Sequence, residues 1–388
     1  MPEYPIEKRL AEVLEKRKQE GSLRTLKLTG GLVDFYSNDY LGFSRSLELD
    51  DLFVQHWQQF HDTNLRKHGS TGSRLLSGNS ELAEEIEYTL QTFHDAPAAL
   101  LFNSGYDANI GMISAFVRPG DVVFYDELVH ASMHDGMKLA RIKGIPFQHN
   151  DMDHLEALLA HTKGESIDFQ KFILVETIYS MDGDPAPLAE ICELAEKYGA
   201  NIIADEAHAT GIFGPKGQGL CYELGLQNRI FARLITFSKA LGNHGAAVLT
   251  SPLGKQYLIN FARSFIYSTA ASLTSLLEIK SAYELLNSHP DFPQQAQKTI
   301  QTFKNLMEIH AHLPFLKGSS SMIQGLLLPG NHEVRKLCAK LLDSGFDLRP
   351  LVFPTVPKGK ERIRICLHTF NSTTEMEGLV ELIDRNLP

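Results

Sequence analysis

The 388-residue sequence is poor in the features that mark several classes of protein. It has four cysteines and no C-x-x-C pair, so we expect neither a disulfide framework nor a zinc site. Its formal net charge is −10 and it has no long basic run, which disfavours a nucleic-acid partner. No apolar run approaches the ~18 residues that span a membrane, and the charged N-terminus lacks the apolar centre of a signal peptide. We therefore expect a cytoplasmic protein without a metal, nucleic-acid or membrane partner.

The composition is that of a globular protein. Hydrophobic residues make up 43% of the chain and charged residues 22%, which argues against disorder. A chain of 388 residues is long for a single hydrophobic core. We predict an N-terminal helix and strand segment (residues 1–45), a large domain (46–285) and a small C-terminal α/β domain (286–388).

Between residues 98 and 250, short apolar runs alternate with helical patterns such as 188–198. The runs are Ala99–Phe102, Val122–Tyr125, Phe172–Val175, Ile202–Ala204, Leu234–Phe237 and Ala246–Leu249. This alternation predicts an α/β fold with a mostly parallel sheet and helices on both faces. Ligands bind such sheets at the carboxyl ends of the strands. The residues that follow the apolar runs are therefore the candidates for a site.

Both ends of the chain carry shorter patterns. An amphipathic N-terminal helix is predicted by apolar residues at helical spacing, which are Ile6, Leu10, Val13 and Leu14. A short strand and a turn follow within 32–43. Near the C-terminus, 321–328 and 362–367 have strand patterns, a helix is predicted over 334–342, and Ser372 begins a capping-box pattern before a last helix. We expect the small C-terminal domain to recruit the N-terminal segment.

Lys239 and Asp205 carry the strongest chemical signal. Each follows an apolar run, in Leu-Ile-Thr-Phe-Ser-Lys and Asn-Ile-Ile-Ala-Asp respectively. An acid and a lysine at successive strand ends suit pyridoxal phosphate (PLP), because its aldehyde needs an amine and its ring nitrogen needs an acid. Taken singly, the lysine is as easily a surface residue and the aspartate a helix N-cap. Thr236, just before the lysine, can donate its hydroxyl to a phosphate.

Two histidines are further candidates. His208 lies three residues after Asp205 and can hydrogen-bond the ring oxygen next to the cofactor aldehyde. His130, in Tyr-Asp-Glu-Leu-Val-His, can stack its flat ring on the cofactor, although a purely structural role is about as common for such a histidine. His134, one helical turn later, is the lesser candidate.

Two Gly/Ser loops and one strand contain residues that suit anionic groups. Residues 103–109 follow a strand and open a helix, and Gly105 lets an anion approach the free N–H groups there. Residues 69–78 form a second Gly/Ser loop, which is neither a Walker loop nor a GxGxxG fingerprint. Arg364, in an alternating strand, can bind a substrate carboxylate, and only its context favours it over Arg362.

Taken in order, these segments resemble the α-oxoamine synthase family of PLP enzymes, which have the aspartate-aminotransferase fold (PLP fold type I). The resemblance runs over nearly the whole chain, from Ser37-Asn-Asp-Tyr-Leu-Gly to Arg362-Ile-Arg. The other motifs that carry it are the 69–78 loop, Asn103–Asn109, the His130 segment, Tyr179-Ser-Met-Asp-Gly-Asp, Asp205-Glu-Ala-His-Ala-Thr-Gly, the Lys239 segment and Phe265-Ile-Tyr-Ser-Thr.

The resemblance implies a role for each candidate. Lys239 would be the Schiff-base lysine and proton carrier, Asp205 would pair with the pyridinium, His208 would bond the ring oxygen, and His130 would stack on the ring. The residues implied to hold the phosphate of the same subunit's cofactor are Gly105, Tyr106 and Thr236. Those implied to reach the neighbouring subunit's phosphate, in a homodimer with shared active sites, are Ser268 and Thr269. Those implied to line the site are Ser180, Glu176, Asn38 and Arg364, the last taking the amino acid carboxylate.

The implied reaction is the decarboxylative condensation of an amino acid with an acyl thioester. The 69–78 loop most resembles the branch that joins L-alanine to a pimeloyl thioester in biotin biosynthesis, and we favour that reaction. Glycine with acetyl-CoA, glycine with succinyl-CoA and serine with palmitoyl-CoA are alternatives. A PLP lyase or aldolase of the same fold is a more distant one. The acyl carrier, CoA or acyl carrier protein, is left open.

Overall fold

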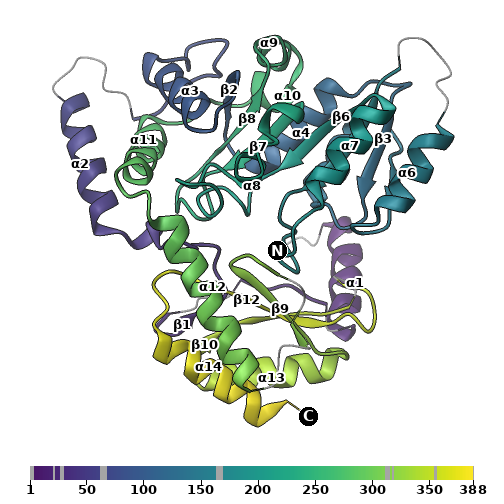
Figure 1. The fold of residues 1–388 in the computed structure, drawn as a ribbon, viewed down its shortest axis with the longest axis vertical. Coiled ribbons are helices and arrows are strands. Elements are labelled where there is room, and N and C mark those ends of the chain that lie inside the picture. The colour runs from purple at the N-terminus through teal and green to yellow at the C-terminus, as the bar shows by residue number, and fades with distance from the viewer. Residues whose placement is uncertain are drawn as a thin grey trace.

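A seven-stranded sheet runs through the upper part of the molecule in Figure 1. The structure is a computed structural model that describes residues 4–20, 22–26, 30–61, 68–162, 169–310, 315–316, 319–353 and 356–387. In spatial order the strands are β2 (Ala98–Phe102), β8 (Ala246–Thr250), β7 (Ala232–Thr236), β6 (Ala200–Asp205), β5 (Lys171–Glu176), β3 (Val122–Asp126) and β4 (Ile145–Phe147). Only β8 runs antiparallel to its neighbours, and the other adjacent pairs are parallel.

The predicted α/β class and mostly parallel sheet are confirmed. All six apolar runs form strands whose limits differ from the predicted ones by at most two residues. The edge strand β4 was not predicted, because its sequence Ile-Pro-Phe is short and contains a proline. Proline cannot donate a ladder hydrogen bond and is therefore confined to edges and bulges.

Helices cover both faces of the sheet, because strand side chains alternate between two hydrophobic cores. In β2, for example, Leu100 and Phe102 enter one core, and Ala99 and Leu101 enter the other. The first core is closed by α4 (Gly105–Phe116), α5 (Ala131–Leu139), α9 (Pro252–Phe261) and α10 (Arg263–Ile266). The second contains side chains of α2 (Leu47–His61), α3 (Glu81–Phe93), α6 (Met152–His161), α7 (Leu188–Tyr198), α8 (Leu220–Glu223) and α11 (Leu273–Ser288).

Serine N-caps begin several of these helices. Ser104, for example, accepts a hydrogen bond from the backbone N–H of Asp107 at 3.0 Å and so starts α4 directly after β2. Short 3₁₀ turns occur at Phe43–Arg45 and Gln227–Arg229. No helix among the described residues is both long and apolar enough to cross a membrane.

The smaller part, below the large sheet in Figure 1, is built around an antiparallel sheet. Its strands, in the order β11 (Arg349–Leu351), β12 (Arg362–Cys366) and β9 (Ile323–Leu327), are accompanied by α12 (Phe292–Ile309), α13 (Asn331–Asp343) and α14 (Thr373–Asn386). The expected capping box of Ser372 and Glu375 begins α14. We propose the same division of the chain, 1–45, 46–285 and 286–388, as the sequence predicts.

The N-terminal segment pairs with the small part. β1 (Val33–Asp34) runs parallel to β10 (Phe346–Asp347), as expected from the predicted recruitment. The backbone N–H of Cys366 also donates to the carbonyl of Phe35 at 2.8 Å. The predicted helix α1 (Pro5–Gln19) is present, but it has no buried residue. Its apolar side chains are exposed on the described chain.

A turn after β5 connects the two parts. Ile178 and Pro185 form an isolated antiparallel bridge that closes the turn. At its tip Asp182 pairs with Arg362 of β12, and both side chains are buried. Because the pair is buried, removing either residue would leave the other charge buried and unpaired, which would destabilise the folded protein.

We predict that Asp182→Asn lowers the free energy of unfolding by about 3 kcal/mol, because it leaves the buried Arg362 cation unpaired. Urea denaturation measures the change. Glu381→Gln is the control, since Glu381 pairs with Arg385 on an exposed surface, where removing the pair costs less than about 1 kcal/mol. Equal, small effects of the two substitutions would contradict the assigned role of the Asp182 pair.

Candidate active site

The predicted catalytic residues meet where β5, β6 and β7 end side by side. The strand register pairs Glu176 with Asp205, and Asp205 with Leu234 of β7. Lys239 follows the end of β7. Burial lowers the pKa of Lys239, and the nearby carboxylates of Asp205 and Glu176 oppose that shift. The two acids and the lysine therefore share one buried site at the carboxyl edge of the sheet.

Lys239 is held by a tight turn. Its carbonyl accepts a hydrogen bond from the backbone N–H of Gly242 at 2.9 Å, and Asn243 donates to the carbonyl of Phe237 at 2.8 Å. Gly242 has a φ of +62°, and a Cβ at this position would lie 2.3 Å from the backbone nitrogen of Ser44. The Lys-Ala-Leu-Gly sequence thus needs its glycine for both conformation and space.

Asp205 is the anchor of a chain of hydrogen bonds. Its side chain is buried and accepts from Nδ2 of Asn109 at 2.8 Å and from the backbone N–H of Ala207 at 2.9 Å. Nδ2 of Asn109 also donates to Oγ of Ser132 at 2.9 Å, and that oxygen lies 2.8 Å from Nδ1 of His130. The structure therefore joins two predicted site residues, Asp205 and His130, through two that the sequence analysis did not select.

Glu176 is buried with incomplete hydrogen bonding. Its Oε2 accepts from the backbone N–H of Ser180 at 3.2 Å, whereas Oε1 has no hydrogen-bond partner among the described residues. Burial and the neighbouring Asp205 raise the pKa of Glu176 to about 8. Near neutral pH, therefore, the protonated form of this side chain predominates.

His208 lies in the same site and contacts the N-terminal segment. Its Nδ1 is 2.7 Å from the hydroxyl of Tyr40, which is also 3.1 Å from Oδ1 of Asn38. Burial lowers the pKa of His208 well below its ordinary value, and the cations of Lys239 and Arg364 add to the effect. Tyr40 was not selected from the sequence, although the Ser37-Asn-Asp-Tyr-Leu-Gly motif contains it.

The structure distinguishes Arg364 from Arg362. Arg362 is paired with Asp182, whereas Arg364 has no acidic partner among the described residues. The Arg364 guanidinium instead donates from Nε to the carbonyl of Ser180 at 2.8 Å and from an NH2 group to Oδ1 of Asn38 at 2.9 Å. Among the described residues, the charge of Arg364 is therefore not neutralised by an acid, unlike that of Arg362.

The start of α4 lies against the end of β7. A Cβ on Gly105 would lie 2.7 Å from Cγ2 of Thr236, so only glycine fits at the first position of this helix. The first turn of α4 therefore packs against the Thr236 side chain, whose hydroxyl donates to the carbonyl of Ala207 at 3.5 Å. The hydroxyl of Tyr106 instead donates to Asp135 at 2.5 Å. A phosphate role for these residues stays a prediction.

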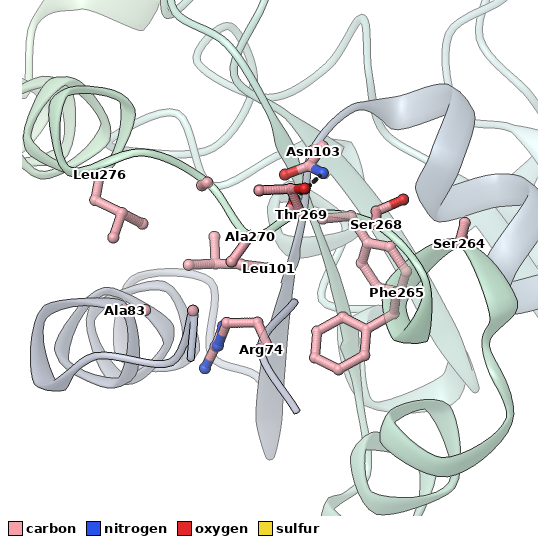
Figure 2. A pocket seen from close by; sticks show the side chains of 13 residues that line it. Arg74, Ala83, Leu101, Asn103, Ser264, Phe265, Ser268, Thr269, Ala270 and Leu276 are labelled. Atoms are coloured by element: carbon pink, nitrogen blue, oxygen red, sulfur yellow. Dashed lines mark hydrogen bonds between the residues drawn. The ribbon is translucent and has the colours of Figure 1, made fainter. Parts of the chain in front are cut away.

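Ser268 and Thr269 line a different pocket in the single chain. Figure 2 shows them beside Asn103 and Arg74, and Nδ2 of Asn103 donates to the carbonyl of Thr269 at 2.7 Å. The residues lining this pocket do not include Lys239. Within one chain, Ser268 and Thr269 therefore do not share a pocket with Lys239. Their predicted role at the cofactor of a neighbouring subunit stays a prediction.

Two other histidines lie near the carboxyl edge. His134, the lesser candidate, contacts the ring of Tyr125 edge-on, with 5.0 Å between ring centroids. His149, which was not selected, bridges two acids: Nδ1 is 3.0 Å from Asp126 and Nε2 is 2.7 Å from Asp184. Burial opposes a charge on His149, but hydrogen bonds to the two acids outweigh it and raise its pKa to about 10.

Comparison with known proteins identifies relatives over nearly the whole chain. Residues 31–383 match the family model described as aminotransferase class I and II. The 8-amino-7-oxononanoate synthase of Emericella nidulans is 42% identical over 397 aligned positions, which cover 96% of this chain and 94% of the relative.

Solved structures have the same fold. The 8-amino-7-oxononanoate synthase of Francisella tularensis is 25% identical, with a TM-score of 0.75, and the match covers 91% of this chain and 97% of that one. A serine palmitoyltransferase from S. paucimobilis, with a bound PLP–myriocin aldimine, has a TM-score of 0.87 at 22% identity and covers 99% and 98% of the two chains. These likenesses confirm the predicted fold class.

We predict that the contribution of His149 to stability depends on pH. The pKa of an unfolded histidine is about 6.5, and the folded value here is about 10. Stability from the charged His149 is therefore fully present below pH ~6.5 and is lost as the pH rises through the folded value. The melting temperature of the parent protein should exceed that of His149→Gln most at pH 6.5, and the difference should shrink towards pH 10.5. His161→Gln, at an exposed position, is the control, and a constant difference for His149→Gln would contradict the prediction.

Proposed function

We propose that this chain, which belongs to the aminotransferase class I and II family, is a PLP-dependent α-oxoamine synthase. It condenses L-alanine with a pimeloyl thioester to give 8-amino-7-oxononanoate, CO2 and the free thiol, a step of biotin biosynthesis. This function is supported by one combination of facts. Lys239, Asp205 and the unneutralised Arg364 meet in one site, and the chain is 42% identical to an 8-amino-7-oxononanoate synthase. Family membership also confirms the resemblance predicted from the sequence.

The buried site fits PLP. Asp205 is a buried acid hydrogen-bonded only to neutral groups, so it suits a ring N–H cation. Oε1 of Glu176 has no hydrogen-bond partner among the described residues, as expected of a position that a polar ligand fills. At the start of α4, Gly105 keeps the backbone N–H groups and Thr236 open to a phosphate. The N–H donors suit the phosphate of the cofactor, Asp205 suits its ring nitrogen, and Lys239 suits its aldehyde.

PLP supplies an aldehyde for an amine and a protonated ring that stabilises negative charge at the α-carbon of an amino acid. Lys239 supplies the amine, because the burial that lowers its pKa favours the neutral, nucleophilic form. The Nζ atom of Lys239 would also move the proton at the α-carbon of the amino acid. Asp205 keeps the ring nitrogen protonated, and Asn109 and Ala207 hold its carboxylate in place.

Arg364 binds the carboxylate of the amino acid. Its charge is not neutralised by any acid of the described residues, and Asn38 beside it adds an amide. Contacts with the carbonyl of Ser180 and with Asn38 fix the guanidinium between the large and small parts. Glu176, whose pKa burial and Asp205 raise to about 8, would hold a proton near the amine of Lys239 at neutral pH. His130, whose Nδ1 lies 2.8 Å from Oγ of Ser132, would stack on the cofactor ring.

The proposal includes a cytoplasmic homodimer. Ser268 and Thr269 complete the phosphate site of the partner's cofactor, because within one chain they line a pocket apart from Lys239. The acyl group is delivered by CoA or by an acyl carrier protein.

The function is tested by measuring thiol release from the PLP-loaded protein with matched substrate pairs. L-Alanine with pimeloyl-CoA is expected to react, and glycine with acetyl-CoA or succinyl-CoA and serine with palmitoyl-CoA are expected to react far less. Lys239→Ala is the control variant and should lose both thiol release and the visible absorbance of the lysine-bound cofactor. If thiol is released only with another substrate pair, that pair contains the true substrates. If no pair releases thiol, the protein is instead a PLP lyase or aldolase.

We predict that Arg364→Leu raises the KM for L-alanine roughly 10- to 100-fold, since a hydrogen bond to a charged group is worth about 1.5–3 kcal/mol. Initial-rate kinetics at saturating acyl-CoA measure it. Arg349→Leu is a matched control, because Arg349 lies opposite Arg364 on the neighbouring strand and is already paired with Asp347. If the KM for L-alanine rises equally in both variants, the effect comes from disturbing the sheet and not from losing the charge of Arg364.

A further inference from the structure

The hydroxyl of Tyr40 lies between the guanidinium of Arg364 and the imidazole of His208. It is 2.7 Å from Nδ1 of His208, 3.4 Å from an NH2 group of Arg364 and 3.1 Å from Oδ1 of Asn38. The tyrosine side chain is buried. It belongs to the N-terminal segment, whereas His208 follows β6 of the large sheet. Tyr40 therefore connects the carboxylate side of the site to the cofactor side.

His208 can carry only one ring proton in this environment. Its side chain is buried, and burial, together with the positive charges of Lys239 and Arg364, lowers its pKa well below the ordinary value. A neutral imidazole has one nitrogen that donates and one that accepts. The partner of Nδ1 thus decides whether Nε2 carries the proton. Among the described residues, Nε2 makes no hydrogen bond.

The surrounding hydrogen bonds favour a tyrosine that donates to His208. Oδ1 of Asn38 already accepts from Arg364 at 2.9 Å, so it does not need the Tyr40 proton. The oxygen of Tyr40 accepts from the same guanidinium, and a donor polarised by a cation is a stronger one. The distance to Nδ1 is the shorter of the two available to the hydroxyl proton. Donation to Nδ1 leaves every group in the chain with a partner of the right kind.

We propose that Tyr40 is a positioning residue that donates its hydroxyl proton to Nδ1 of His208 and so makes Nε2 an N–H donor towards the bound cofactor. Arg364 polarises this hydroxyl, so the group that binds the substrate carboxylate also supports the donor that faces the cofactor. The inference rests on the proposed function for the identity of the cofactor. The position of the proton on His208 is inferred from the hydrogen bonds of the chain alone.

The first test uses the cofactor-free, full-length protein labelled with [15N]histidine. Nitrogen chemical shifts give the protonation of each ring nitrogen, and comparison with His208→Gln assigns the signals. In the parent protein Nε2 of His208 should be protonated and Nδ1 not. In Tyr40→Phe the ratio of the two neutral forms should move roughly 5- to 10-fold towards protonated Nδ1, which corresponds to a lost hydrogen bond of about 1 kcal/mol.

Tyr283→Phe is the matched control. Tyr283 is also a buried tyrosine whose hydroxyl bonds a buried histidine, with 2.8 Å to Nε2 of His94. Its loss costs the protein a similar hydrogen bond but should leave the signals of His208 unchanged. Asn38→Ala provides a second variant if Tyr40→Phe folds poorly. It removes the competing acceptor, so Nε2 of His208 should stay protonated.

The second test uses the PLP-loaded protein. Loss of a donor to the ring oxygen disfavours its anionic form, so the pH midpoint of the visible absorbance change should rise in Tyr40→Phe and not in Tyr283→Phe. The kcat should fall more than the KM for L-alanine rises, since Arg364 keeps its charge. Identical His208 signals in the parent protein and Tyr40→Phe would overturn the inference. If no variant develops visible absorbance with PLP, the proposed function fails, but the cofactor-free spectra still decide where the His208 proton lies.

Discussion

The site depends on the cost of placing charges close together out of water. The parallel register of β5 and β6 puts Glu176 beside Asp205, and both are buried. Burial, and after it the charge of the neighbouring Asp205, raise the pKa of Glu176 to about 8, so Glu176 keeps its proton at a pH where an exposed glutamate has lost it. Lys239 adds the opposite charge, while its own burial favours the neutral amine. The lysine and the two acids thus share one buried site at the carboxyl edge of the sheet.

The part of this site that faces a substrate carboxylate in the proposed function comes from elsewhere in the chain. Asn38 and Tyr40 belong to the N-terminal segment, which is attached to the small part by the pairing of β1 with β10 and by the bond from Thr369 to the carbonyl of Tyr40. Arg364 comes from β12 and reaches the carbonyl of Ser180 on the large part. The site is therefore complete only when the two parts keep their relative position, which the buried pair of Asp182 and Arg362 helps to fix.

The main features of the fold could be read from the sequence because buried parallel strands leave continuous apolar runs. Candidate residues at the ends of those runs could be found for the same reason. The hydrogen bonds that join Asp126, His149 and Asp184 could not be predicted from the sequence. These residues come from three separate loops or strand ends and match no local pattern. The hydrogen bonds from Asn109 through Ser132 to His130 were missed likewise, because they join side chains of two different helices and match no local pattern.

The sequence by itself determined the order of strands and helices, the presence of a lysine and an acid after two of them, and the family resemblance. The tertiary structure alone decided which arginine keeps an unneutralised charge. Arg362 and Arg364 are two positions apart on one strand and so lie on the same face. No periodic pattern can separate them; the approach of Asp182 from a distant turn neutralises one and leaves the other. The contact of Tyr40 with His208 likewise exists only because two remote segments fold against each other.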